Sequence, residues 1–437
     1  MSNDFGHTHS PGRRSGAVAG LSLAAFIGTA LVVRVLTDDR SAPNSRQTGS
    51  LNLSGVIAVL FILLAILLVL RNRRGVLPAV LAAVWLGVWT AVAIGTRGAS
   101  TETLREGVRE ASVVALGLIV YSARGALSVP LAARLVQIAG AVPAVVALFQ
   151  LANGTGMDVA GHIRSNGTFA HPNSAAMFFA VAGIVSLWRY LDCGRRLPDA
   201  VLTALFVAAL IATYSIDGLV TLVAMLLMLG ALRPGRLGID RVPFVIAGLL
   251  VLVFFATPLG SARIASESAT NLASAERGEA NSTLAWRLNK WKTLLPGWEH
   301  SPVYGQGLGT TVTEEPIFGN EYAGDPPHNE YLRYLVETGV IGLAVLIGPL
   351  ALLIRGLVRR RRVSGTVEAG TLNAPLVALV VLAGCMINAL ADNTVLYSTA
   401  SYAAALIIGA ALCLPPEDSS AADLADGAQH HPSPAPA

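Results

Sequence analysis

The stretch LNLSGVIAVLFILLAILLVL, residues 51–70, contains no charged residue and is long enough to cross a bilayer as a helix. It is one of many apolar runs in a chain of 437 residues that is 53% hydrophobic and only 13% charged. A soluble domain usually carries about 25% charged residues. The composition therefore predicts a polytopic membrane protein whose spanning elements are helices.

The apolar runs predict about 12 transmembrane helices, so the expected fold is an all-α polytopic membrane protein. One large extracytoplasmic loop is expected between helices 9 and 10. The expected spans are roughly 17–36, 51–70, 76–95, 107–122, 129–151, 173–190, 199–214, 217–232, 242–259, 334–355, 374–392 and 396–414.

These spans divide the chain into five segments. The two terminal segments are expected to be disordered, since the tail is rich in Ala, Pro and Asp and can bury little apolar surface. The segments are 1–16, the cytoplasmic N-terminus; 17–259, helices 1 to 9; 260–333, the extracytoplasmic loop with an amphipathic helix; 334–414, helices 10 to 12; and 415–437, the cytoplasmic tail.

The arginines between the apolar runs predict the orientation. They cluster in alternate connecting segments, and cytoplasmic loops are the ones that carry an excess of basic residues. Both termini are therefore assigned to the cytoplasm. The clusters assigned there are Arg13 and Arg14; Arg71, Arg73 and Arg74; Arg124; Arg189, Arg195 and Arg196; Arg233, Arg236 and Arg241; and Arg355 with Arg359 to Arg362.

Composition also argues against several classes of protein. The net charge is only +4 and the basic residues are scattered between apolar runs, so nucleic acid is not an expected partner. The three cysteines, Cys193, Cys385 and Cys413, have neither metal-ligand spacing nor the pattern of a disulfide framework. We expect no cleavable signal sequence, and residues 17–36 are interpreted as a first span that stays.

A short outside loop, residues 152–172, contains Arg164 among glycine, serine and asparagine. Its planar guanidinium can bind a phosphate through two parallel hydrogen bonds. Equally, Arg164 could pair with Asp158 or extend to the headgroup level. His162 and His171 in the same loop are interpreted as loop or cap residues rather than as catalysts.

The large loop contains a predicted amphipathic helix. Its cations, Arg287 and Lys290, lie one turn apart and off the apolar stripe, so both can face an anion at headgroup level. The helix could lie in the headgroup plane or pack on the other outside loops. The apolar stripe is Leu284, Leu288, Trp291, Leu295 and Trp298, and Pro296 is expected to end the regular pattern.

Glycines alternate in HSPVYGQGLG, at Gly305, Gly307 and Gly309. Alternating glycines permit tight turns and a close approach of the backbone to a ligand. They do not form a dinucleotide-binding fingerprint, because no strand–turn–helix frame surrounds them. We interpret them as structural glycines.

The stretch DPPHNEYLRYLVETGVIG, residues 325–342, places a histidine directly before an apolar run. With Asp325 as the helix cap, His328 would lie in the first turn. The positive end of the helix dipole favours neutral imidazole, which can act as a base. The alternative is that His328 is only a capping histidine.

A helical projection of this stretch places Gly339 and Gly342 on the face of His328. That face would be smooth and could approach neighbouring helices closely. Arg333 and Glu337 fall on the opposite face as an i,i+4 pair.

The sequence HNEYLRYLVETGVIG fits the spacing H-N-x9-G-x2-G, with His328, Asn329, Gly339 and Gly342. Together with RSNGTFAHPN, WRLNKW and HSPVYGQGLG, it resembles the O-antigen ligase and polymerase superfamily of bacterial envelopes. By motif the resemblance covers about residues 150–345. In the number of predicted spans and in the large loop near the C-terminal end, the resemblance covers the whole chain.

The resemblance implies a glycosyltransferase of the cytoplasmic membrane that needs no metal, cofactor or nucleotide sugar. It would move a glycan from an undecaprenyl-diphosphate carrier to the hydroxyl of a glycan or glycolipid acceptor outside the cytoplasm. His328 would be the general base, and Arg164 and Arg287 would bind the diphosphate and stabilise the leaving group. We therefore expect substitution of Arg164 or Arg287 to weaken donor use, and substitution of Arg333, on the face opposite His328, to affect it little. Lys290 and Asn329 are further substrate-binding candidates. Ligase and polymerase remain open.

One motif departs from the family. Its members often carry Ser-Arg after the seventh span, whereas this chain has Ile216 and Asp217 after Ser215. Asp217 is expected to repel an anion, and Lys290 could take the place of the missing arginine.

The alternative function is a twelve-span secondary transporter or a flippase for an envelope precursor. Transporters usually show internal repeats and polar sites at the membrane midplane, and the sequence shows no repeat. Asp392 and Asn393 are interpreted as loop-boundary residues rather than as a proton relay. A purely structural scaffold would leave the spaced His, Arg and Gly set unexplained.

Overall fold

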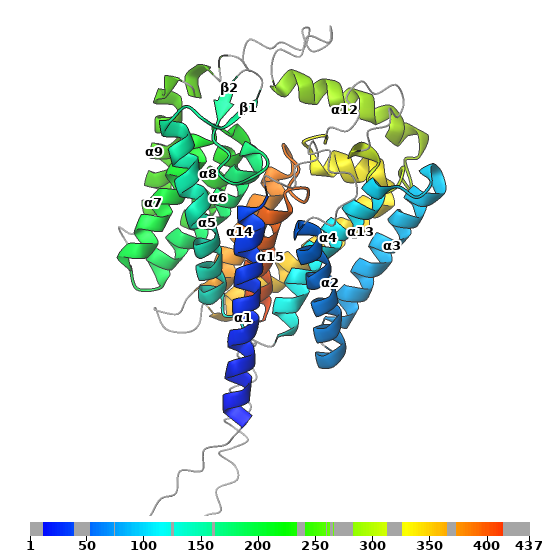
Figure 1. Cartoon of the computed structure of the whole chain (residues 1–437), viewed down its shortest axis with the longest axis horizontal. Helices are drawn as coiled ribbons and strands as arrows, with labels where there is room; N and C mark the ends of the chain where they lie inside the picture. The colour runs from blue at the N-terminus through cyan, green and yellow to red at the C-terminus, as the bar shows by residue number, and fades with distance from the viewer. Residues whose placement is uncertain are drawn as a thin grey trace, which may run out of the picture.

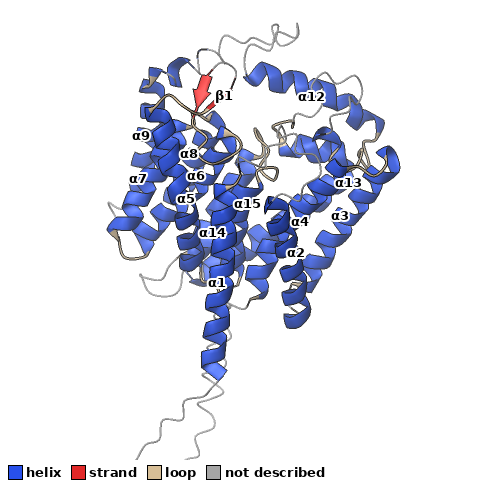
Figure 2. Ribbon diagram, viewed as in Figure 1, coloured by secondary structure: helices blue, strands red, loops and turns tan. Residues whose placement is uncertain are grey.

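The computed structural model describes residues 12–38, 53–73, 75–123, 126–159, 162–233, 241–258, 260–262, 265, 283–312, 326–364 and 373–413. Within these ranges the protein is helical apart from loops and one two-stranded antiparallel sheet (Figure 2). Asp325, the predicted cap, lies outside the described residues, as do the whole tail from residue 414 and the chain before Gly12.

Each predicted span falls on a helix of the described part. α1 already begins at Gly12, inside the segment expected to be disordered. The helices are α1 (Gly12–Leu36), α2 (Leu53–Asn72), α3 (Val76–Arg97), α4 (Thr101–Ser122), α5 (Val129–Ala152), α6 (Pro172–Asp192), α7 (Leu197–Ala212), α8 (Ile216–Leu232), α9 (Val242–Ala256), α13 (Glu330–Ser364), α14 (Ala374–Asn388) and α15 (Ser398–Leu412).

Five of these helices, α2, α3, α5, α6 and α13, are long and apolar enough to cross a bilayer. Other apolar helices are shorter, with 10–17 residues, and the first half of α4 is rich in charge. The protein is therefore an all-α, multi-pass membrane protein, while the number of spans stays a prediction.

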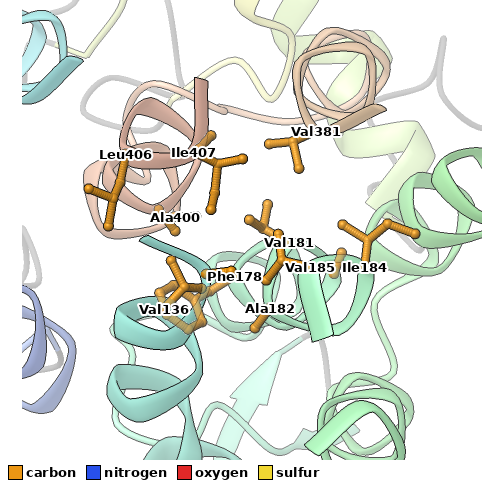
Figure 3. Packing of buried hydrophobic residues seen from close by; sticks show 14 of the residues in the cluster. Val136, Phe178, Val181, Ala182, Ile184, Val185, Val381, Ala400, Leu406 and Ile407 are labelled. Atoms are coloured by element: carbon orange, nitrogen blue, oxygen red, sulfur yellow. The ribbon is translucent and has the colours of Figure 1, made fainter. Parts of the chain in front are cut away.

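Helix α6 is the centre of the bundle. Of its apolar window 94% is buried, because α5, α7, α8, α14 and α15 all pack against it. Figure 3 shows Val136 of α5 beside Phe178 of α6, and Val181 of α6 on the side that faces Ile407 of α15 and Val381 of α14. A helix enclosed on every side has a fixed position, and so has the loop that leads into it.

Polar loops from distant parts of the chain meet at one end of the bundle, at the top of Figure 1. Asp38, after α1, accepts hydrogen bonds from the backbone N–H of Ala170 and the hydroxyl of Thr399. The sheet of β1 (Met157–Val159) and β2 (His162–Arg164) lies at the same end. The predicted topology assigns all of these loops to the outer side.

Helix α12 (Thr283–His300) lies across this end of the bundle (Figure 1). The amphipathic helix was expected to end its regular pattern at Pro296, which is wrong, because the helix continues through that residue to His300. It buries Arg287 and Lys290 and exposes Leu284 and Leu295. The cationic face therefore points into the protein, and two leucines of the apolar stripe face outward.

Helix α13 is broken at Gly339, whose φ of 62° and ψ of −170° are not helical. The carbonyls of Pro302 and Val303 accept hydrogen bonds from Val340 and Ile341 at the break. The helical projection that grouped Gly339 and Gly342 with His328 is wrong for this reason. The break sets the first two turns of α13 apart from its long remainder.

The alternating glycines let a loop pack against two helices. Gly305, Gly307 and Gly309 all have positive φ, between 70° and 95°. A Cβ at Gly305 would lie 2.4 Å from the carbonyl carbon of Glu337, and one at Gly307 would lie 2.2 Å from the Cα of Ala93. The backbone of this loop, which was expected to approach a ligand closely, thus approaches α13 and α3 instead.

The break at Gly339 predicts a sharp cost for a side chain there. Gly339→Ala should destabilise the protein by more than the ~1–3 kcal/mol of backbone strain, since its Cβ would also lie 2.3 Å from the Val303 carbonyl oxygen. Thermal unfolding in detergent measures the effect. Gly87→Ala is the control, because nothing lies within 4 Å of its Cβ position. Equal melting temperatures for the two variants would contradict the assignment.

Candidate functional site

The centre of the site is a short hydrogen bond between two residues far apart in sequence. Nδ1 of His328, in the segment before α13, lies 2.6 Å from Oδ1 of Asp392, between α14 and α15. The Asp392 side chain is 1% exposed and that of His328 is 16% exposed. Because Nδ1–H donates to the carboxylate, the lone pair of the imidazole is on Nε2. His328 is thus set up to accept a proton.

Asp392 is held as a carboxylate by the groups around it. Its Oδ1 also accepts hydrogen bonds from the Tyr397 hydroxyl at 2.9 Å and the Asn393 backbone N–H at 2.9 Å. Burial opposes ionisation, but the electrostatic interaction and hydrogen bond with His328, and then the charge of Arg287, outweigh it and hold the pKa of Asp392 below its usual range. Burial and the Asp392 charge raise the pKa of Tyr397, which keeps its proton.

His328 owes its position to the chain on either side of it. The carbonyl of Pro327 accepts a 2.7 Å hydrogen bond from the indole N–H of Trp291 on α12. The ring of Trp286 meets the His328 ring edge-on, with centroids 5.4 Å apart. On the other side, Asn329 caps α13, because its Oδ1 accepts the backbone N–H of Leu332 at 3.0 Å.

The expectation that His328 lies in the first helical turn is therefore wrong. It precedes the helix, with φ of 49°, in the left-handed region that few non-glycine residues adopt. Asn329, a substrate-binding candidate, uses its side-chain oxygen as the cap instead. The unusual backbone aims the histidine away from the helix and toward the loop of Asp392.

A second histidine lies beside the first. The rings of His171 and His328 have centroids 6.3 Å apart, and His171 stacks on Tyr397 with 8° between the ring planes. His171 caps α6, as expected for a cap residue, because its Nδ1 accepts the backbone N–H of Asn173 at 3.1 Å. Burial, reinforced by Arg164, lowers its pKa to about 3, so the ring is neutral.

Arg164, at the end of β2, connects this strand to the start of α6 and the end of α7. Its Nε donates to the carbonyl of Thr213 at 2.8 Å, and one terminal nitrogen donates to Oδ1 of Asn173 at 2.6 Å. The residue is 2% exposed. The structure thus places Arg164 next to His171, whose pKa it affects.

Arg287 reaches the site from α12 and forms a two-pronged ion pair with Asp217 of α8, at 2.6 and 3.2 Å. Burial disfavours its charge, but Asp217 outweighs burial and raises the pKa of Arg287. Asp217, expected to repel an anion, is thus paired and anchors this arginine. Lys290, one turn along α12, is fully buried.

A buried ionic cluster adjoins His328. Arg333 donates to Glu330 at 2.7 Å, to Glu110 at 2.7 Å and to Glu337 at 3.3 Å, and Glu106 lies 3.8 Å away. The i,i+4 pair with Glu337 is present, but the Arg333 side chain is 0% exposed. The prediction that substitution of Arg333 has little effect on donor use stays a prediction, but the burial of Arg333 indicates a structural role for the side chain.

Sequence reasoning missed the roles of Asp392, Tyr397 and His171. Asp392 and Asn393 had been interpreted as loop-boundary residues, which they are, but their loop turns back onto His328. The signal that could have found Asp392 is an acidic residue at the outer end of a predicted span. Among the described residues, no group of three or more His, Cys, Asp or Glu side chains could hold a metal ion.

Comparison with known protein families gives one match. Residues 201–347 match the family model described as O-antigen ligase. The resemblance to the O-antigen ligase superfamily is confirmed. No curated protein matches the chain. The matched residues include Asp217, Arg287 and His328, whereas Arg164 and Asp392 lie outside them.

The buried cluster predicts a large effect of Arg333→Ala. Removing the guanidinium leaves several buried carboxylates without their cation, which typically costs about 3–5 kcal/mol. We expect a strongly lowered melting temperature in detergent and a low yield of folded protein. Arg359→Ala, at an exposed position of the same helix, is the control. A melting temperature for Arg333→Ala equal to that of the control would refute a stabilising role of the cluster.

Proposed function

We propose that this member of the O-antigen ligase superfamily transfers a glycan from an undecaprenyl-diphosphate carrier to an acceptor hydroxyl, with His328 as the general base. A membrane glycan transferase of the ligase or polymerase type is what the family match indicates. The donor, the acceptor, the side of the membrane and the independence from metal ions are parts of the proposal.

The observation that carries the proposal is the 2.6 Å contact between Nδ1 of His328 and Oδ1 of Asp392. A buried carboxylate on Nδ1 fixes the ring orientation, leaves Nε2 unprotonated and stabilises the imidazolium that forms when Nε2 takes a proton. Among the described residues, the groups within hydrogen-bond distance of the His328 ring both lie at Nδ1, and with the proton on Nδ1 the hydrogen bond is the one donated to Asp392. Nε2 therefore serves the substrate.

In the proposed step, Nε2 of His328 accepts the proton of the acceptor hydroxyl as its oxygen attacks the anomeric carbon of the donor sugar. The bond between that carbon and the diphosphate oxygen breaks, and its electron pair leaves with undecaprenyl diphosphate. The imidazolium later releases its proton to water or to the leaving diphosphate. No redox change occurs, and the carrier diphosphate supplies the leaving group.

Basic groups on two other segments suit the diphosphate. Arg164 on β2 and Arg287 on α12 both act electrostatically on His171. Charge-assisted hydrogen bonds to phosphate stabilise charge as it develops on the leaving group. Asp217 holds Arg287 in place and balances its charge in the absence of substrate. Lys290 and Asn329 remain proposed contributors to substrate binding.

The proposed location of the site is the outer surface of the cytoplasmic membrane, with both termini in the cytoplasm. Arginine clusters such as that of Arg355 and Arg359 lie at the opposite ends of the helices from His328. The exposed Leu284 and Leu295 of α12 suit a helix whose outer face contacts the lipid bilayer. There the carrier headgroup could reach the site without crossing the membrane.

The transporter alternative is not favoured. The family match is to O-antigen ligases, and the described polar centre lies at one end of the bundle rather than at the middle of its helices. Substrate sites of secondary transporters lie near the membrane midplane.

The proposal predicts that His328→Gln abolishes most transfer. Loss of a general base typically lowers the rate by about 10²–10⁴-fold. Purified protein in liposomes, supplied with lipid-linked glycan and acceptor, would be assayed for the transferred glycan. His300→Gln, at an exposed histidine of α12, is the matched control.

Normal transfer by folded His328→Gln protein would remove the base assignment while leaving the transferase function intact. If the wild-type protein transfers no glycan, yet moves a lipid-linked or soluble glycan across the liposome membrane, the alternative function is favoured.

A further inference from the structure

His171 has no role in the step above, yet its ring lies beside that of the proposed base and interacts electrostatically with both arginines. It stacks on the ring of Tyr397, whose hydroxyl donates a hydrogen bond to Asp392. The ring centroids of His171 and His328 are 6.3 Å apart. Four charged or titratable groups act on it electrostatically: Arg164, Asp392, His328 and Arg287. These are the groups assigned to proton transfer and to diphosphate binding.

The cap hydrogen bond fixes the tautomer of His171. Its Nδ1 accepts the backbone N–H of Asn173, so Nδ1 carries no proton. A neutral imidazole has one proton, and it must then be on Nε2. Burial and the positive charge of Arg164 lower the pKa of His171 to about 3, so the ring does not gain a second proton at neutral pH.

The two histidines thus have opposite tautomers. The contact with Asp392 makes Nε2 of His328 an acceptor, and the contact with Asn173 makes Nε2 of His171 a donor. Within the described part of the chain, the hydrogen bond of the His171 ring is the one at Nδ1. A rigid neutral donor costs less to desolvate than a charged one, and it stays a donor throughout the reaction.

We propose that His171 is a second catalytic residue, which donates a hydrogen bond through Nε2–H to an oxygen of the donor's diphosphate as the sugar–oxygen bond breaks. The inference rests on the proposed function, since it names the group that receives the leaving group opposite the base. Arg164 and Arg287 supply charge to the same diphosphate, and His171 supplies a directed donor. In this arrangement α6 contributes to the site through its N-terminal cap residue.

Two substitutions separate the cap from the donor. Asn at position 171 keeps an acceptor at the place of Nδ1 and is a good helix cap, but it lacks the outer N–H. Gln can place an amide N–H where Nε2–H was, but its acceptor is one bond too far to cap α6 in the same way. His171→Asn should therefore be the more stable variant and His171→Gln the more active one.

Two measurements test this, both on the full-length protein in nanodiscs. The first is binding of undecaprenyl diphosphate, where we expect His171→Asn to weaken affinity on the order of 10-fold, as for a lost hydrogen bond to a charged group. The second is glycan transfer, where removal of one donor to developing charge typically lowers kcat by about 10²–10³-fold. His171→Gln should retain more of both, despite a lower melting temperature.

Wild-type binding and transfer by folded His171→Asn protein would overturn the inference and leave His171 as a helix cap only. Equal losses in folded Asn and Gln variants would overturn it too, because the donor atom would then not matter. Absence of transfer by the wild-type protein would instead refute the proposed function. The binding measurement keeps the two failures apart, since it does not depend on turnover.

Discussion

The hydrogen bond between His328 and Asp392 is the interaction on which the site depends. The contacts around it keep the two residues, which come from different loops, next to each other. The backbone N–H of Glu330 donates to the carbonyl of Ala389 at 2.9 Å, which joins the start of α13 to the loop of Asp392. Arg333, buried among carboxylates, fixes the same two turns of α13 from the other side. A break at Gly339 lets these turns take their own direction, so a loop histidine and a loop aspartate can meet although both flank membrane helices.

Helix α6 provides the second fixed point. Its burial on all sides makes its N-terminus rigid, and there Asn173 binds Arg164 while His171 forms the cap. The site is thus assembled between two firmly placed segments, with α12 lying over it and delivering Arg287. The pairing of Arg287 with Asp217 explains how the chain accommodates an aspartate close to where members of the family that it resembles often carry an arginine. The acidic residue orients a cation that another helix supplies.

The positions of the helices could be predicted from the sequence. A long apolar run inside a bilayer has no water to bond to, so its backbone groups must hydrogen-bond to one another, as they do in a helix. Sequence reasoning also proposed His328, Arg164 and Arg287 as site residues, and the structure brings all three to one end of the bundle. It could not identify Asp392 as the partner of His328, since nothing local to Asp392 indicates which loop it will face. The helical projection failed at Gly339 because loop carbonyls of Pro302 and Val303, far from any local pattern, replace the helical hydrogen bonds. The sequence also could not show that Arg287 and Lys290 point into the protein. Their orientation depends on Asp217 and other groups beneath α12, which are distant in sequence.

The central claim is that His328 and Asp392 act as one unit in glycan transfer. A double-mutant cycle measures this most directly, through the transfer rates of His328→Gln, Asp392→Asn and the double variant, each verified as folded. Residues that act as a unit are strongly non-additive, so the account predicts that the double variant is about as slow as His328→Gln alone. Losses that multiply, with the double variant slower by the product of the two single effects, would contradict it.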